Sequence, residues 1–321
     1  MGFGSFELLC QRANIPLCPL VGPYDPDVDN LFGRGIISGC YARSIVLANT
    51  MIFNIGTVFL HLGTILMIGI AVYTVYCKYT AVGRREMLDL FYMFFFLEVW
   101  ALVVDAGVAP ATSPTYPYFV AIECGLASGV ILQLLLSGMV GYQLWEDGSV
   151  KSVWSLRISS FVWGLIVFLV AIFTFNGGED GWPDTLNPRN TAPLMGVLYV
   201  VNLVFILLYA CETFYLSAVL IRNIWATCSY ALALFFFVSG QLLVFAFGRL
   251  ICDSVRHYID GNFFGTFCNL CAFLMIYRAY DTLTSEDLEF TVSPRDSNWD
   301  AKSGDADSQY ALSNYNLQVP N

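Results

Sequence analysis

Residues 154–175 read WSLRISSFVWGLIVFLVAIFTF, an apolar run in which Arg157 is the one charged side chain. A run of this length crosses the hydrocarbon core of a bilayer, about 30 Å, as a single α-helix. It is too long and too uniformly apolar for a strand of a membrane β-barrel, where apolar and polar residues alternate. The stretch therefore predicts a transmembrane helix.

Six further runs of the same kind occupy most of the chain, and they lie at residues 46–77, 87–108, 118–144, 193–220, 228–250 and 262–280. The weakest division falls at residues 221–228, where only Arg222 and Asn223 interrupt the apolar residues. The composition agrees, because 57% of the 321 residues are hydrophobic and only 12% are charged. So few charges would not cover the surface of a soluble protein of this size. We predict an all-α polytopic membrane protein, a bundle of seven transmembrane helices.

Lysine and arginine in the short loops predict the orientation of the bundle, since these residues favour the cytosolic side. Those that follow helices one, three and five are Lys78, Arg84, Arg85, Lys151, Arg157 and Arg222. Those that follow helices two, four and six are Arg189, Arg249 and Arg256. This bias predicts a lumenal N-terminal tail (residues 1–45), a seven-helix domain (residues 46–281) and an acidic, mostly disordered cytosolic tail (residues 282–321).

Several classes of function lack the residues that they need. The net charge is −10 and no basic patch with interleaved aromatic residues appears, which argues against nucleic-acid binding. The two histidines, His61 and His257, lie in different segments, so a three-histidine zinc site cannot form. The chain has no nucleophile elbow, phosphate-binding loop or dinucleotide fingerprint. We therefore predict no enzymatic activity, no metal and no cofactor.

Four cysteines fall on the oxidising side of the predicted topology, namely Cys10, Cys18 and Cys40 in the N-terminal tail and Cys252 after helix six. Disulfides persist in such compartments, so one or two bridges that pin the tail to that loop are candidates, with three possible full pairings. The alternative is that some of these residues are buried thiols. The remaining six cysteines lie in or beside helices, where a small packing residue is the usual role.

Carboxylates inside the predicted membrane region are the main candidates for function, because a charge in lipid is costly. They are Asp89, Glu98, Asp105, Glu123 and Glu212. Glu98 and Glu123 lie nearest their helix centres, so they are candidates for a proton relay, an ion site or a polar face that contacts another membrane protein. The alternative is pairing within the bundle, for example with Gln133, Asn202 or Gln241. Gly125 and Gly129 form a GxxxG step, which serves either packing within the bundle or contact with a partner helix.

The acidic tail contains Asp287-Leu288-Glu289, a di-acidic D-x-E pattern. On a cytosolic tail, an exposed acidic segment of this kind can dock on a basic groove of the vesicle coat that gathers cargo at the endoplasmic reticulum. Asp287 and Glu289 are therefore a candidate export signal. The alternative is a solvated acidic tail without a specific partner.

Seven ordered strings carry a resemblance to a known family, and they are CYARSIVLANTMIF from Cys40, KYTAVGRRE from Lys78, DAGVAPATSPTYPYFVA from Asp105, GYQLWEDG from Gly141, FFFVSGQLLVFAF from Phe235, ICDSVRHYIDGNFFGTFCNL from Ile251 and EDLEF from Glu286. On these strings the chain resembles the fungal chitin synthase export chaperones. The likeness extends over residues 6–292.

The resemblance implies a multi-pass protein of the endoplasmic reticulum membrane that helps a polytopic chitin synthase to fold and leave that compartment, in support of cell wall chitin synthesis. Chitin synthase would be the partner, and the vesicle coat at export sites a second one. Whether the protein then stays with its client on the way to the plasma membrane is left open.

Two other classes compete with this interpretation. A seven-helix receptor or transporter fits the helix count, although no D-R-Y follows helix three and no N-P-x-x-Y occurs in helix seven. An intramembrane enzyme acting on lipid would use the carboxylates as acid and base.

Overall fold

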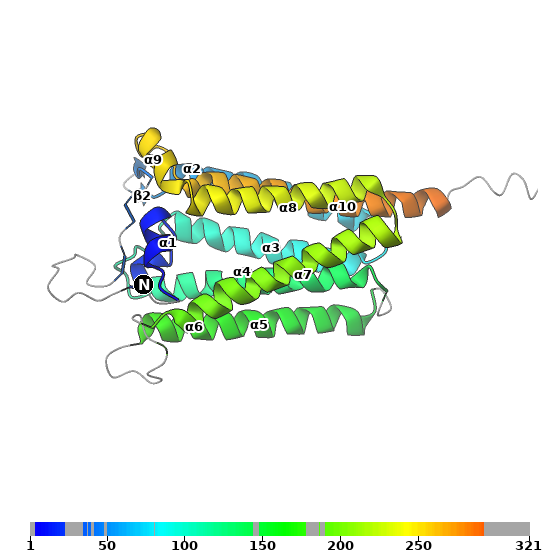
Figure 1. The fold of residues 1–321 in the computed structure, drawn as a ribbon, viewed down its shortest axis with the longest axis horizontal. Helices are drawn as coiled ribbons and strands as arrows, with labels where there is room; N and C mark the ends of the chain where they lie inside the picture. The colour runs from blue at the N-terminus through cyan, green and yellow to red at the C-terminus, as the bar shows by residue number, and fades with distance from the viewer. Residues whose placement is uncertain are drawn as a thin grey trace, which may run out of the picture.

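The structure is a computed structural model that describes residues 4–22, 35–36, 38–39, 42–47, 50–79, 81–143, 148–177, 186 and 190–291, with the side chains at 47, 50 and 285–291 excepted. Seven helical spans in it are long and apolar enough to cross a membrane. Six of them run almost in parallel along the molecule, and the fifth crosses them obliquely (Figure 1). The prediction of a seven-helix polytopic bundle is confirmed.

Four of the spans form the first half of the bundle: α2 (Ile55–Cys77), α3 (Arg84–Asp105), α4 (Tyr116–Val140) and α5 (Val150–Asn176). Consecutive helices pack against each other, and α4 also contacts the fifth span, so α4 is the central helix. Half of the α4 span is buried, the largest share of the seven. The polar networks of this half are therefore built around α3 and α4.

The fifth span is the continuous helical stretch Ala192–Leu220, in which α6 (Ala192–Met195), η2 (Gly196–Val201), α7 (Asn202–Tyr215) and η3 (Leu216–Leu220) follow without a break. Both η2 and η3 are wide π-helical turns. The span runs obliquely across α4, from the side of α5 towards the start of α8 (Figure 1). It is the least buried of the seven spans.

The last two spans are α8 (Ile224–Phe245) and the long α10 (Gly261–Thr291), with the short α9 (Gly248–Ser254) between them. Arg222 at φ 57° ends the fifth span, and the Asn223 side chain accepts a hydrogen bond of 3.2 Å from the Ala226 amide to cap α8. The break predicted at residues 221–228 is therefore present as a sharp turn with its own cap.

The first apolar run differs from its predicted form. The helix begins at Ile55 rather than at residue 46, because β1 (Ile45–Leu47) and β2 (Thr50–Ile52) form an antiparallel hairpin before it. Five of the six strand residues are apolar, so hydropathy alone joined them to the helix that follows. Asn54, at φ 47°, makes the turn from the hairpin into α2.

The other difference lies at the end of α10. This helix continues to Thr291, so residues 282–291 are helical where the sequence predicted the start of a disordered tail. Its last turns project from the bundle at the end opposite to the N-terminal segment (Figure 1). Residues 292–321 lie outside the described part of the chain.

Candidate functional site: buried polar residues and the N-terminal cap

A three-residue network joins α2 to α3 near the end of the bundle that carries the N-terminal segment. His61 Nδ1 lies 2.6 Å from Glu98 Oε2, and His61 Nε2 lies 3.2 Å from Asp105 Oδ2. Glu98 and Asp105 are seven residues apart, two turns of α3, so both project from the same face towards α2. From the sequence, His61 was considered only as a possible metal ligand, and this network was not predicted.

The position of His61 in the sequence contained a usable signal. His61 lies in the second turn of α2, and Glu98 and Asp105 lie in the last two turns of α3, the next helix. Consecutive spans joined by a short loop are antiparallel, so the sequence places these three residues within the same two turns at one end of the α2–α3 pair. A buried histidine at the depth of two carboxylates predicts pairing.

Glu123 of α4 lies close enough to this network for its charge to interact with Asp105, His61 and Glu98. Its Oε2 atom is buried and has no hydrogen-bond partner among the described residues. Two of the three amides proposed as internal partners bind elsewhere: Gln133 accepts from Ser160, and Asn202 donates to Ser128. Of the two carboxylates nearest their helix centres, Glu98 is therefore paired with His61 and Glu123 keeps an unpaired oxygen.

The GxxxG step on α4 faces α5. A side-chain carbon added at Gly125 would lie 2.8 Å from the Gly164 carbonyl oxygen, and one added at Gly129 would lie 3.2 Å from the Ser160 carbonyl oxygen. Small residues at this spacing let two helix backbones approach closely. This face of α4 is thus covered by α5.

Glu212 of α7 is a second intramembrane carboxylate without a partner. Its Oε1 atom is buried and makes no hydrogen bond within the described residues. The main-chain oxygen of the same residue accepts a hydrogen bond of 2.6 Å from the Tyr142 hydroxyl. The carboxylate itself faces Gly138 of α4, which has no side chain to offer.

Ion pairs hold the opposite end of the bundle together. Arg157 of α5 binds Asp89 of α3 through two hydrogen bonds of 2.6 and 2.8 Å, and Lys78 pairs with Asp281 of α10. Arg157, which was counted with the loop charges although it belongs to the run at residues 154–175, lies inside α5 and is paired with Asp89. Asp89 is likewise paired and structural.

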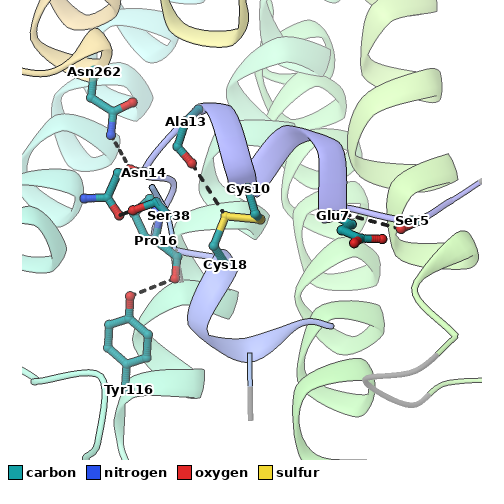
Figure 2. Close-up of a disulfide and its surroundings, with 10 residues drawn as sticks. All are labelled: Ser5, Glu7, Cys10, Ala13, Asn14, Pro16, Cys18, Ser38, Tyr116 and Asn262. Atoms are coloured by element: carbon teal, nitrogen blue, oxygen red, sulfur yellow. Dashed lines mark hydrogen bonds between the residues drawn. A yellow bond between two sulfur atoms is a disulfide. The ribbon is translucent and has the colours of Figure 1, made fainter. Parts of the chain in front are cut away.

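The N-terminal segment forms a folded cap on the bundle. In it, α1 (Glu7–Arg12) and η1 (Cys18–Leu20) are joined by the Cys10–Cys18 disulfide (Figure 2). The Tyr116 hydroxyl donates to the Pro16 carbonyl at 2.7 Å, and the Asn262 amide donates to the Asn14 carbonyl (Figure 2). The Thr191 hydroxyl donates to the Gly4 carbonyl at 2.6 Å.

Of the two other candidate disulfide residues, one lies within the described part of the chain and one does not. Cys252 of α9 is disulfide-bonded. Cys40 lies outside the described residues. Near α9, the Arg43 amide donates to the His257 carbonyl at 2.9 Å and the Arg43 guanidinium lies 4.7 Å from the centre of the Tyr258 ring. These contacts tie the segment before β1 to the loop after α9.

A cavity of about 540 Å³ lies between the cap and the bundle. Its lining is mostly apolar, with Asn14, Asn54, Asp105 and Tyr116 among its polar residues. Asp260, just before α10, is buried nearby, and this burial raises the pKa of its carboxyl to about 6. Asp260 Oδ1 accepts a hydrogen bond of 3.2 Å from the Phe263 amide and so caps α10.

Asp287 and Glu289, the candidate export signal, lie in the part of α10 that projects from the bundle. The backbone there is helical, and the side chains are outside the described part of the chain. Within the described residues, no group of three or more His, Cys, Asp or Glu side chains could hold a metal ion.

Comparison with known proteins decides the family. A sequence model described as "Chitin synthase export chaperone" matches residues 2–294. The chain belongs to the chitin synthase export chaperone family. Curated relatives carry the same name: one from Yarrowia lipolytica is 45% identical over 94% of this chain and 91% of its own length. Another, from Candida albicans, is 42% identical over 91% of this chain and 93% of its own length.

A third relative with this name, from Emericella nidulans, is 43% identical over 94% of this chain and 89% of its own length. A comparison with solved structures finds no match. The family match includes the cap, all seven spans and the positions of Asp287 and Glu289, and it ends before most of the acidic tail. The resemblance seen in the sequence is thereby confirmed, and the receptor or transporter alternative is not favoured.

Proposed function

We propose that this chain is a membrane chaperone of the endoplasmic reticulum that assists folding and export of a polytopic chitin synthase and so supports cell wall chitin synthesis. The observation that carries the proposal is the family match over residues 2–294 together with relatives of the same name aligned along nearly their whole length. The seven apolar spans fit a protein that meets its client within the bilayer.

The chain acts by binding rather than by catalysis in this proposal. A polytopic client exposes polar helix faces in the membrane until its own helices assemble. A bundle with unpaired polar atoms at intramembrane positions can cover such faces and reduce wrong pairing. Glu123 is the better candidate for such a contact because its Oε2 atom is unpaired within the described residues. Glu98 is a weaker candidate because its carboxylate is already hydrogen-bonded to His61.

The proposed orientation places the N-terminal cap in the lumen and the end of α10 in the cytosol. The Cys10–Cys18 disulfide supports this orientation, since disulfides persist on the lumenal side. Asp287 and Glu289 would then face the vesicle coat at export sites. Their place on a helix that projects from the bundle supports access for such a partner.

Deleting the gene in its fungal host and following a fluorescently tagged chitin synthase tests the chaperone role. We expect the synthase to accumulate in the endoplasmic reticulum and wall chitin to fall, with both restored by the wild-type chain. Normal arrival of the synthase at the cell surface in the deletion strain, with unchanged chitin, would overturn the proposal.

The export signal is tested by complementing that strain with the double variant Asp287→Ala and Glu289→Ala. We expect the client to stay in the reticulum while the chaperone remains folded and still co-purifies with it. Asp305→Ala with Asp307→Ala removes the same charge beyond the family match and serves as the matched control. Equal export of the client by both double variants would show that Asp287 and Glu289 are not an export signal.

Client contact through the bundle is tested by Glu123→Gln, with Glu98→Gln as the comparison. We expect Glu123→Gln to weaken co-purification of the client, because the buried Oε2 atom has no partner within the described residues and would gain one when the client separates the helices that cover it. Unchanged recovery of the client would assign Glu123 to the packing of the bundle alone.

A further inference from the structure

We propose that the face of α7 around Glu212 is the docking site for a transmembrane helix of the client, and that this helix carries a hydrogen-bond donor that pairs with the Glu212 carboxylate. The inference rests on the proposed chaperone function and adds to it a place on the bundle and a chemistry of recognition.

The Glu212 carboxylate is an acceptor without a donor. Its Oε1 atom is unpaired within the described residues and buried against Gly138 of α4, which has no side chain, so a donor on an outside helix would reach the carboxylate through Oε2. The Tyr142 hydroxyl beside it donates to the main-chain oxygen of Glu212 instead. Glu212 lies eight residues before Leu220, the end of the span, and therefore about 12 Å inside it. A carboxylate at that depth is costly unless it is paired, so a donor from outside the chain would stabilise it.

The surface next to Glu212 is an apolar stripe that no other part of the described chain covers. Its exposed residues recur at helical spacing, and they are Leu203, Val204, Leu207, Leu208, Cys211 and Tyr215. Only 11% of this span is buried, the smallest share of the seven. Glu212 lies at one edge of the stripe, next to Cys211, so the face combines a broad apolar contact with one polar group.

The flanking turns of α7 also distinguish this helix. The segments η2 and η3, on either side of it, are π-helical turns. Such turns are rare and frequently occur at functional sites, because they shift the register of the side chains that follow. In η3 this shift follows directly after Tyr215, the last residue of the stripe.

The chemistry of the face favours a protein helix with a donor over the other possible occupants. Lipid chains can cover the apolar stripe, but they offer no donor to a carboxylate within the hydrocarbon region. A second copy of this chain would bring a second Glu212 to the interface, and the stripe itself carries no Lys, Arg, Asn or Gln. A polytopic client with an amide, guanidinium or ammonium group on an unassembled helix supplies what the face lacks.

The experiment places a photoreactive amino acid at position 211 of the full-length chain, in microsomes from cells that express a tagged chitin synthase. Cys228 is the matched control position, since it is also exposed and lies near the start of α8, close to the same end of the bundle. After irradiation, we expect a cross-linked product with the synthase from position 211 and none from position 228.

The charge requirement is tested with Glu212→Gln in the position 211 background. We expect about three- to tenfold less cross-linked product, the effect of one interhelical hydrogen bond in a membrane. Asp253→Asn makes the same charge change on exposed α9 and should leave the product unchanged. If Glu212→Gln fails to fold, cross-linking from position 211 in the chain that keeps Glu212 still tests the docking face.

Three results would overturn the inference: equal products from positions 211 and 228, a product between two copies of this chain, or lipid adducts without any protein product. These outcomes are separable from failure of the proposed function. If export depends on the chain while position 211 gives no client product, the chaperone role stands and this docking face falls. If the deletion strain exports the synthase normally, the proposed function itself falls.

Discussion

Replacing His61 by alanine removes the centre of the buried network that joins α2 to α3. The variant cannot make the 2.6 Å hydrogen bond with Glu98 or the 3.2 Å hydrogen bond with Asp105, and it leaves both carboxylates buried without their partner. Removing one member of a buried pair costs about 3–5 kcal/mol in soluble proteins, whereas single hydrogen bonds between membrane helices are worth about 0.6 kcal/mol on average. Because the substitution removes both hydrogen bonds, we expect the free energy of unfolding to fall by about 2–4 kcal/mol.

Thermal unfolding of the purified full-length protein in detergent, followed by size-exclusion chromatography of the soluble fraction, measures this effect. A decrease of that size corresponds to a Tm lower by roughly 3–7 °C for a domain of this length. Phe59→Ala on the same helix removes a side chain that is 74% exposed, and it is the matched control with little expected change. The triple variant His61→Ala, Glu98→Gln, Asp105→Asn should recover part of the stability, because neither Glu98 nor Asp105 is then left as an unpaired charge.

A His61→Ala variant as stable as Phe59→Ala would refute the stabilising role of the network. A triple variant less stable than His61→Ala would also refute it, because neutralising the two carboxylates would then have brought no relief.

Three further predictions concern packing, the cap and pH. Gly125→Leu should lower the free energy of unfolding by about 1–3 kcal/mol, and with it the Tm, because the new side chain meets the α5 backbone. Gly63→Leu is the control and should be neutral, since nothing lies within 4 Å of it. Equal Tm values for the two variants would contradict the α4–α5 contact. Cys10→Ser with Cys18→Ser should cost about 2–3 kcal/mol, measured as Tm with and without reductant, and a reductant-insensitive wild type would contradict the disulfide. The folded pKa of Asp260 is raised to about 6, so its protonated form stabilises the fold at low pH and that contribution is lost as pH rises from about 4 to 6. Asp260→Asn should reduce the change in the free energy of unfolding over that pH window by up to about 3 kcal/mol. An unchanged pH dependence would contradict the raised pKa of Asp260.

The sequence was sufficient for the seven spans because their apolar runs match the thickness of a bilayer. The boundaries were harder to predict where two kinds of structure share one composition. Residues 45–52 are as apolar as the helix that follows, and only the hairpin pairing of Ile45 with Ile52 separates them from α2. The helical extension to Thr291 was missed because a polar, acidic sequence is typical of disorder as well as of an exposed helix.

The sequence predicts which polar residues lie in the membrane region, but not which of them pair with one another. The sequence identified the intramembrane carboxylates, but their pairing depends on which helix faces which. Glu98 is paired with His61, a residue that composition suggested only as a metal ligand. The oblique path of α7 across α4 places Glu212 opposite Gly138. Gly138 has no side chain, so it offers the Glu212 carboxylate no partner.

The N-terminal cap was the feature least visible in the sequence. The tail before residue 45 has too few apolar residues in a row to indicate a helix, yet Phe6, Leu17 and Val21 are fully buried against the bundle. The contacts that fix it come from Tyr116, Thr191 and Asn262, which lie far away in the chain. Such long-range contacts leave no periodic pattern, so local reasoning cannot find them.

The most direct test of the central claim is a budding reaction with endoplasmic reticulum membranes prepared from cells that lack the chain. The measured quantity is the fraction of tagged chitin synthase that enters coated vesicles, relative to an unrelated polytopic cargo. We predict that the synthase fails to enter vesicles from these membranes, that the unrelated cargo enters normally, and that membranes carrying the wild-type chain restore synthase entry. Efficient packaging of the synthase without the chain would contradict the export-chaperone role.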